Sequence, residues 1–220
     1  MWNTIKAKMA NKKAVSDFRK LTVQYAESPV DTTLDVNAKM NELQSVDGDL
    51  SDLQAKYMAA AAETAIRSLP DGQNFQIGAS NLTATMILAS LFHEKNRNAL
   101  QLVDPDNKAA NVNQLAETSV RGDTSEKISH STKSVDSFFL DKNPSVSFAL
   151  IDACDDYSDA KQIYQTCADH TETGSLIAAF DVDNEACAAS LKAFREVLLD
   201  QPQWVLWAHC KNLAVVRREF

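Results

Sequence analysis

The stretch NFQIGASNLTATMILASLF, residues 74–92, decides the fold class of this chain. It opens as a short apolar run, turns at Gly78, and continues as an apolar pattern with helical spacing. Such a strand, turn and helix is typical of a loop that binds a phosphate or a nucleoside, and equally of a core strand that turns into a core helix. The chain has only five glycines, and this turn holds one where nucleotide loops usually have two or three.

The same alternation of strand and helix continues to the end of the chain. Alternating strands and helices with continuous apolar strands predict a parallel sheet covered on both faces. The closing pair of strands, joined by Lys211 and Asn212, has the pattern of a tight hairpin. The predicted strands are 74–78, 99–104, 119–124, 146–152, 175–181, 203–210 and 213–220, and the predicted helices are 80–93, 107–116, 134–142, 158–170 and 184–199.

The first third of the chain contains no convincing strand. Residues 14–27 have helical spacing of apolar side chains, and the alanine-rich segment 49–69 is strongly helical, with Ser51 as its predicted N-cap. The sequence PDG at 70–72 ends that helix. We therefore expect a helical cap over residues 1–70 and an α/β core over residues 71–220.

Composition narrows the classes of partner. The net charge is −8, which disfavours binding to a nucleic-acid backbone, and the lysines near the start are expected to form a solvated helix face. No apolar run is long enough to cross a bilayer, and the basic N-terminus lacks the features of a secretory signal, so we expect a cytoplasmic protein without a membrane partner. The four cysteines match no zinc pattern and are expected to be buried free thiols.

Each predicted parallel strand delivers a turn residue or a carboxylate to one edge of the sheet, where ligands bind in such folds. Asp104 is suited either to capping the next helix or to accepting hydrogen bonds from two ribose hydroxyls. Asp123 is either a turn residue or a contact to the amine of adenine. Asp152 and Asp181 either cap helices or converge on the reacting atoms, as metal ligands or as a base.

From residue 74 onward the chain resembles a class I S-adenosylmethionine (SAM)-dependent methyltransferase, most similar to small-molecule O-methyltransferases of the caffeoyl-CoA/catechol and macrocin type. The resemblance covers about two-thirds of the chain and rests on FQIGASNLTA, LVDPD, GDTSEKI, the segment FALIDACDDYSDAKQIYQTCADHTETGSLIAAFD and the terminal WVLWAHCKNLAVVRREF. It implies a Rossmann-like, doubly wound, seven-stranded sheet whose last strand is antiparallel. The helical first third would then cover the acceptor site.

The resemblance also assigns roles to residues. It implies SAM-dependent methyl transfer to an oxygen of a small molecule, with Asp152 and Asp181 beside the methyl group as base, orienting group or ligands of Mg²⁺, a possible second cofactor. A homodimer is possible. The cofactor-binding residues it implies are Gln76, Gly78, Ala79, Ser80, Asp104, Pro105, Asp123, Thr124 and Asp152.

The chain departs from the family at several of these positions. Gln76 replaces an acid, Leu82 replaces a second glycine, and Val182 replaces the asparagine that follows the aspartate in metal-dependent members. A glycine at position 82 would allow the backbone to approach the cofactor closely. These departures keep a second hypothesis open, that of a non-catalytic protein with the methyltransferase fold that acts by binding or scaffolding.

Other enzyme classes fit less well. Tyr157 and Lys161 have the YxxxK spacing of short-chain dehydrogenases, but the first turn lacks that family's three glycines. No GxSxG elbow is present to support a Ser–His–Asp hydrolase, and His130 is expected in a polar loop. A phosphate-binding P-loop is also absent.

Overall fold

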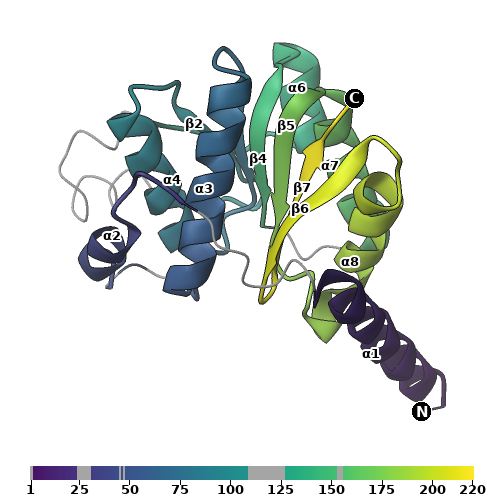
Figure 1. Cartoon of the computed structure of the whole chain (residues 1–220). Helices are drawn as coiled ribbons and strands as arrows, with labels where there is room; N and C mark the ends of the chain where they lie inside the picture. Colours follow the sequence, from purple (N-terminus) through teal and green to yellow (C-terminus); the bar gives the residue numbers. More distant parts are fainter. Residues whose placement is uncertain (1, 24–30, 45, 47, 109–126, 153–155) are drawn as a thin grey trace.

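A computed structural model gives the fold as one sheet with helices on both faces (Figure 1). It describes residues 2–23, 31–44, 46, 48–108, 127–152 and 156–220, with the side chains from residue 6 onward. The strands are β1 (Gln73–Ile77), β2 (Leu100–Val103), β3 (Ile128–Ser131), β4 (Val146–Ile151), β5 (Thr171–Ala179), β6 (Trp204–Cys210) and β7 (Leu213–Arg218). The helices are α1 (Trp2–Thr22), α2 (Val36–Glu42), α3 (Asp52–Ser68), α4 (Leu82–Glu94), α6 (Val135–Lys142), α7 (Tyr157–Asp169) and α8 (Ala188–Phe194).

The sheet has seven strands in the order β3-β2-β1-β4-β5-β7-β6. Strands β1 to β5 pair in parallel, and β7 is antiparallel to both of its neighbours. The chain therefore winds outward from β1 in one direction and then, after returning to β4, in the other. The Rossmann-like, doubly wound sheet with an antiparallel last strand is confirmed.

Strand β4 shows why the sheet has to be covered on both faces. All of its residues are buried, and successive side chains point to opposite faces. Phe148 and Leu150 join one apolar cluster with α2, α3 and α4, whereas Ala149 and Ile151 join a second cluster with α6, α7 and α8. The continuous apolar run in the sequence thus becomes the shared middle layer of a three-layer fold.

Polar side chains mark where the helices begin. Ser51 and Gln54 form a capping box at the start of α3, as expected from the predicted N-cap. Asn81 caps α4, Ser134 caps α6 and Asp156 caps α7, in each case by accepting a backbone N–H. Helix α3, which precedes residue 70, packs in the same apolar cluster as α4, which follows it. The division of the chain into a cap and a core at residue 70 stays a prediction.

The sheet contains one strand that we did not predict. We predicted a strand over 119–124, which falls outside the described residues, and a loop around His130. The third strand of the sheet is β3, and His130 lies within it. This strand is four residues long, pairs only with β2 and is largely half-exposed, so its sequence ISHS carries none of the apolar pattern that identifies a central strand.

Two further expectations need correction. The predicted helix 184–199 is a 3₁₀ turn at Glu185–Cys187, then α8, then a π-helical turn at Arg195–Leu199. Cys167 and Cys210 are buried free thiols, and burial raises the pKa of Cys167 to about 12, but Cys187 is disulfide-bonded. Spacing along a chain does not reveal which side chains meet in space, so this bond could not be read from the sequence.

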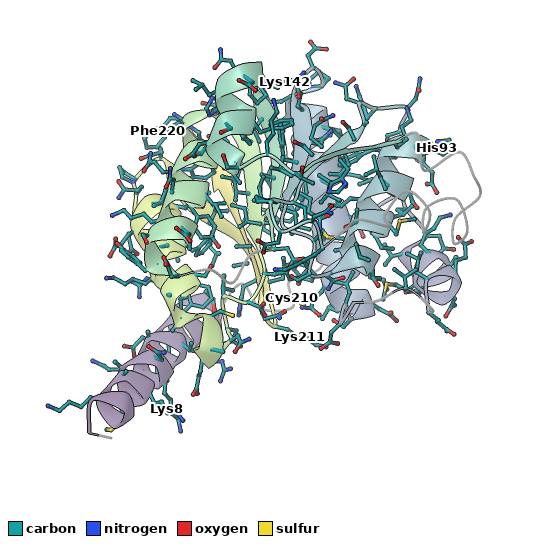
Figure 2. The ribbon with its side chains drawn as sticks, turned by 180° about the vertical axis from the view of Figure 1, so that it is seen from behind. Lys8, His93, Lys142, Cys210, Lys211 and Phe220 are labelled. Atoms are coloured by element: carbon teal, nitrogen blue, oxygen red, sulfur yellow. The ribbon has the colours of Figure 1, made fainter. Side chains whose placement is uncertain are left out.

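Helix α1 contacts the body from Asn11 onward, mainly through its C-terminal half. The ring of Phe18 meets that of Phe194 edge-on at a centroid distance of 6.4 Å, and the guanidinium of Arg19 forms an ion pair with Asp183. The other half projects away from the sheet, and Lys8 marks it (Figure 2). Lysines in this half are exposed, as the expected solvated face requires. No helix among the described residues is long and apolar enough to cross a membrane.

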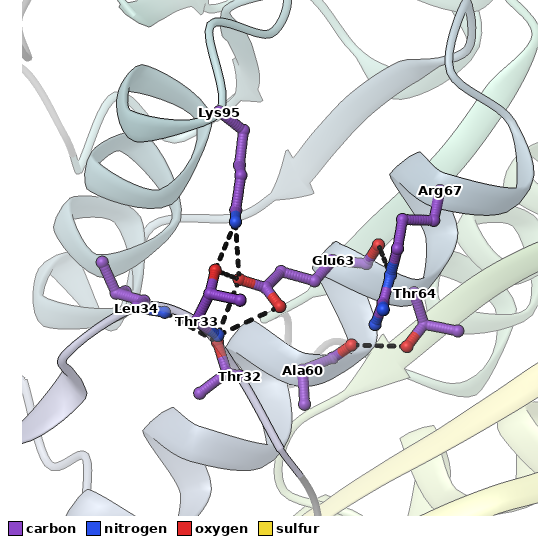
Figure 3. A network of polar contacts seen from close by, with 8 residues as sticks. All are labelled: Thr32, Thr33, Leu34, Ala60, Glu63, Thr64, Arg67 and Lys95. Atoms are coloured by element: carbon purple, nitrogen blue, oxygen red, sulfur yellow. Dashed lines mark hydrogen bonds and ion pairs between the residues drawn. The ribbon is translucent and has the colours of Figure 1, made fainter.

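A buried carboxylate holds the cap segment before α2 onto the sheet-covering helices (Figure 3). Glu63 on α3 is 3% exposed and accepts hydrogen bonds from the backbone N–H and the hydroxyl of Thr33, while Lys95 at the end of α4 lies 3.5 Å from its Oε1. Burial raises the pKa of Glu63, but the hydrogen bonds from Thr33 and the charge of Lys95 outweigh it, so the net pKa lies below the usual value of 4.5. The ionised form therefore stabilises the fold.

We expect Glu63→Gln to lower the melting temperature at pH 7 by roughly 3–8 °C, since a lost hydrogen bond to a charged group costs about 1.5–3 kcal/mol. Because the folded pKa is lowered, this stabilisation is present above pH 4.5 and is lost as the pH falls through the folded pKa. Thermal unfolding of both proteins between pH 3 and 8 measures the difference. Glu42→Gln, at an exposed ion pair with Lys39, is the control and should show little change; an equal effect of both variants would contradict this account.

Candidate active site

The strand register brings four turns together at one edge. The last paired rows join Ile77 to Val103, Ile77 to Ile151, and Ile151 to Ala179. One further backbone hydrogen bond extends each of these strand pairings past its last paired residues, for example from Asp152 N to Ile77 O at 2.8 Å. The residues that follow β1, β2, β4 and β5 must therefore lie side by side, as expected for parallel strands.

These turns surround a cavity of about 470 Å³, the size of a small-molecule site. Eight of the described residues that line it follow β1, β2, β4 or β5, and six of these were singled out from the sequence. The six are Gly78, Ser80, Asp104, Pro105, Asp152 and Asp181, and the other two are Asp106 and Lys108.

The turn after β1 is held by a buried carboxylate from β4. Gly78 takes a positive φ of 82°, which glycine adopts without strain. Asp152 accepts a hydrogen bond from the Ser80 hydroxyl at 2.6 Å and another from the Asn81 N–H at 2.7 Å. Burial raises the pKa of Asp152, opposed by these two hydrogen bonds. The carboxylate thus fixes the turn and the first residues of α4.

The leucine that replaces the family's second glycine turns away from this cavity. Leu82 is the first residue of α4, and its side chain packs against the apolar cluster that includes α2 and α3. It is not among the cavity-lining residues. Gly48 in the cap makes a close approach here, because a Cβ at that position would lie 2.5 Å from Asn81 Oδ1 and 2.9 Å from Thr83 Oγ1. The cap and the first turn therefore pack as one unit.

Asp104 follows β2 and is almost fully buried, with 1% of its surface exposed. Its N–H donates to Ser131 O at 2.9 Å, its carbonyl accepts from Asn107 N at 3.0 Å, and its Oδ2 lies 3.9 Å from His130 Nε2. A carboxylate fixed in this way at the cavity is suited to accept hydrogen bonds from two adjacent hydroxyls.

Asp181 follows β5 in a left-handed conformation, with φ at 60°. Such a conformation is unfavourable for a residue other than glycine, and it is found more often at functional sites. Asn212 in the β6–β7 turn donates from Nδ2 to Asp181 Oδ1 at 3.0 Å. The side chain lines the cavity together with that of Asp152.

Sequence reasoning missed one side of the cavity. This side is formed by the start of α6 and by α7, through Ser134, Val135, Asp136, Asp159, Gln162 and Ile163. The residues from α6 follow β3, a strand that we did not predict. Asp123 and Thr124, which we expected there, lie outside the described residues.

Two other expected cofactor residues do not line the cavity. Gln76 is fully buried in β1 and donates from Nε2 to Gly78 O at 3.2 Å. Ala79 is buried in the apolar cluster with α3 and α4. Tyr157 and Lys161 do not line the cavity either. The Lys161 amine is 3.3 Å from the Tyr157 hydroxyl, and both side chains contact Glu196.

The charge around the cavity is strongly negative. Among the described residues, six aspartates and one lysine, Lys108, line it. This balance favours a ligand that carries positive charge and disfavours one whose main feature is a phosphate. Among the described residues, no group of three or more His, Cys, Asp or Glu side chains is arranged to hold a metal ion. Mg²⁺ prefers several oxygen ligands, and its binding by Asp152 and Asp181 stays a prediction.

Several solved structures that superpose on this chain are O-methyltransferases. The apo structure of CalS11, a TDP-rhamnose 3'-O-methyltransferase of calicheamicin biosynthesis, superposes with a TM-score of 0.60 at 15% identity, over 97% of this chain and 93% of that one. The chain has a class I methyltransferase fold. An O-methyltransferase from Bacillus cereus in complex with SAH (S-adenosylhomocysteine) gives a TM-score of 0.56 at 15% identity, over 87% of this chain and 93% of that one.

TomG from Streptomyces achromogenes, an O-methyltransferase of tomaymycin synthesis in complex with SAM, gives a TM-score of 0.55 at 12% identity, over 91% of this chain and 96% of that one. No protein-family model matches the sequence, and no curated protein matches it. The resemblance seen in scattered short motifs is therefore a resemblance of fold, carried by a diverged sequence.

The turn after β1 makes a direct prediction. Ser80→Ala removes one donor from the buried carboxylate, so the pKa of Asp152 should rise further and the free energy of unfolding should fall by about 1.5–3 kcal/mol. The carboxyl carbon of Asp152, followed by NMR as a function of pH, reports the pKa, and urea unfolding reports the stability. Ser134→Ala, at the other side of the cavity, is the control and should leave the pKa of Asp152 where it is.

Proposed function

We propose that this protein transfers a methyl group from SAM to an oxygen of a small molecule. The observation that carries the proposal is the cavity at the carboxyl ends of β1, β2, β4 and β5, with buried Asp104 at one strand end and Asp152 and Asp181 at two others. The fold shared with O-methyltransferases supports the same reaction class.

The described residues fit SAM by size and charge. The cavity of about 470 Å³ is in the range of cofactor sites, and its excess of carboxylates complements a ligand with a positively charged sulfur and amine. Gly78 brings the backbone of the first turn to the cavity without a side chain between them. In this proposal Asp104 holds the ribose hydroxyls and Ser80 lines the part of the cavity that takes the methionine part.

Bound SAM supplies an electrophilic methyl group that the acceptor oxygen attacks in line. The chain's task is then to position the two reactants and to take the proton of the acceptor. Asp152 is committed to Ser80 and Asn81, so it serves mainly to shape the turn. Asp181 has one oxygen held by Asn212 and is the better candidate for orienting the methyl donor or accepting a proton.

The acceptor would enter from the cap side. The segment after α2 approaches the first turn at Gly48 and Val46, where Thr83 Oγ1 donates to Val46 O at 3.4 Å. No described residue of 1–70 lines the cavity, and we propose from the resemblance alone that the helical cap over residues 1–70 selects the small-molecule acceptor. A homodimer and a cytoplasmic location stay predictions.

A second hypothesis is a binding or scaffolding protein that keeps the fold without the reaction. Gln76 favours it, because this buried amide replaces the family's acid at the start of the first motif and does not line the cavity. Leu82 no longer favours it, since its side chain packs into the apolar cluster.

Isothermal titration with SAM and SAH decides between the two hypotheses. We expect both to bind the wild-type protein, and Asp104→Asn to weaken them about tenfold to a hundredfold, the value of one or two hydrogen bonds to a charged group. Asp71→Asn changes an exposed aspartate at the opposite edge of the sheet and is the matched control. A folded wild-type protein that binds neither compound would refute the methyltransferase proposal.

A further inference from the structure

A chain of oriented side-chain amides connects the cap to the carboxylate of Asp181. Gln54, near the start of α3, donates from Nε2 to Asn212 Oδ1, and Asn212 donates from Nδ2 to Asp181 Oδ1. The backbone is tied in as well, because Val182 N donates to Asn212 O at 3.2 Å. The β6–β7 turn is thus bonded on one side to the cap and on the other to the cavity.

Each amide in this chain has its orientation set by the one before it. Gln54 Oε1 accepts from Ser51 N at 3.1 Å and from the Ser51 hydroxyl at 2.7 Å, which leaves its Nε2 to face Asn212. Because Gln54 donates, Asn212 must accept through Oδ1, and its own donor Nδ2 then faces Asp181. Gln54 is 4% exposed, so water competes little for these bonds.

The turn itself does not explain why residue 212 is an asparagine. Asparagine is favoured in tight hairpins because it tolerates a positive φ. Here the positive φ of 53° belongs to Lys211, and Asn212 is not among the described residues with positive φ. The side chain of Asn212 is therefore used for its two hydrogen bonds. The hairpin pattern KN that we recognised in the sequence has a second use.

We propose that Asn212, oriented by Gln54, positions the Asp181 carboxylate toward the positively charged sulfur of SAM. This inference rests on the proposed function. One oxygen of Asp181 is held by Asn212, and the left-handed backbone at Asp181 fixes where the side chain leaves the strand. Asn212 and Gln54 are positioning residues, and the methyl donor is the group on which they act through Asp181.

The difference between SAM and SAH gives a readout specific to this role. SAH lacks the methyl group and the positive charge on sulfur but keeps every other part of SAM. A loss of general structure weakens both ligands alike, whereas a misplaced Asp181 weakens SAM more than SAH.

The sharpest variant is Gln54→Glu. Glutamate is as favourable as glutamine at this position of a capping box, so α3 keeps its start. The carboxylate offers no donor to Asn212, so the Asn212 amide should turn over and present Oδ1 to Asp181. We expect the preference for SAM over SAH, measured by isothermal titration, to fall about tenfold. A simple added negative charge would strengthen SAM binding instead.

Asn212→Ala tests whether the effect passes through Asp181. It should lower the preference for SAM in the wild-type background and leave it unchanged in the Asp181→Asn background, because the group it acts on is then gone. Asn184→Asp is the control: it adds a charge near the cavity, keeps the acceptor for Ala186 N, and should not lower the preference.

The outcomes separate the two claims. If wild-type protein binds SAM and SAH but Gln54→Glu and Asn212→Ala leave their ratio unchanged, or weaken both ligands equally, the positioning role is wrong and the proposed function stands. If Asn212→Ala lowers the ratio equally with and without Asp181, the role does not pass through that residue. If the folded wild-type protein binds neither ligand, the proposed function and this inference both fail.

Discussion

The edge of the sheet that carries the cavity depends on the contacts of the buried Asp152 carboxylate. This carboxylate comes from the end of the central strand β4, and it binds both the hydroxyl of Ser80 and the N–H of Asn81. Three elements meet there: β4, the turn after β1 and the start of α4. A charged acceptor in so enclosed a position would be costly without such donors. The arrangement therefore requires the turn to adopt one conformation, which is also the conformation that opens the cavity beside Gly78.

How far the sequence predicts this fold depends on how strongly each element is buried. Central strands such as β4 are apolar throughout because both faces are covered, so their pattern identifies them without ambiguity. The edge strand β3 has few packing constraints, and its sequence ISHS could not be distinguished from a loop. The helical segment that includes α8 was also predicted only in part. Its apolar spacing predicts a helix but not the change to a π-helical turn at residue 195.

The site could be predicted as a list of strand ends but not as a set of contacts. Asp104, Asp152 and Asp181 were identified because each follows an apolar strand. Their different surroundings come from distant parts of the chain: Ser80 for Asp152, and Asn212 for Asp181. The residues from α6 and α7 were missed because they belong to helices, and nothing in an amphipathic helix pattern marks the turn that faces a cavity.

The contact at Gly48 has a consequence for how this protein can diversify. The cap loop touches the residue that caps α4, and no side chain larger than that of glycine fits between them without displacing Asn81 or Thr83. A change in the cap at this contact would therefore be transmitted to the residues that follow the first turn, beside the cavity. In this chain, substitutions in the cap are therefore constrained where Gly48 contacts Asn81 and Thr83, and are less constrained at the outer surface of the cap.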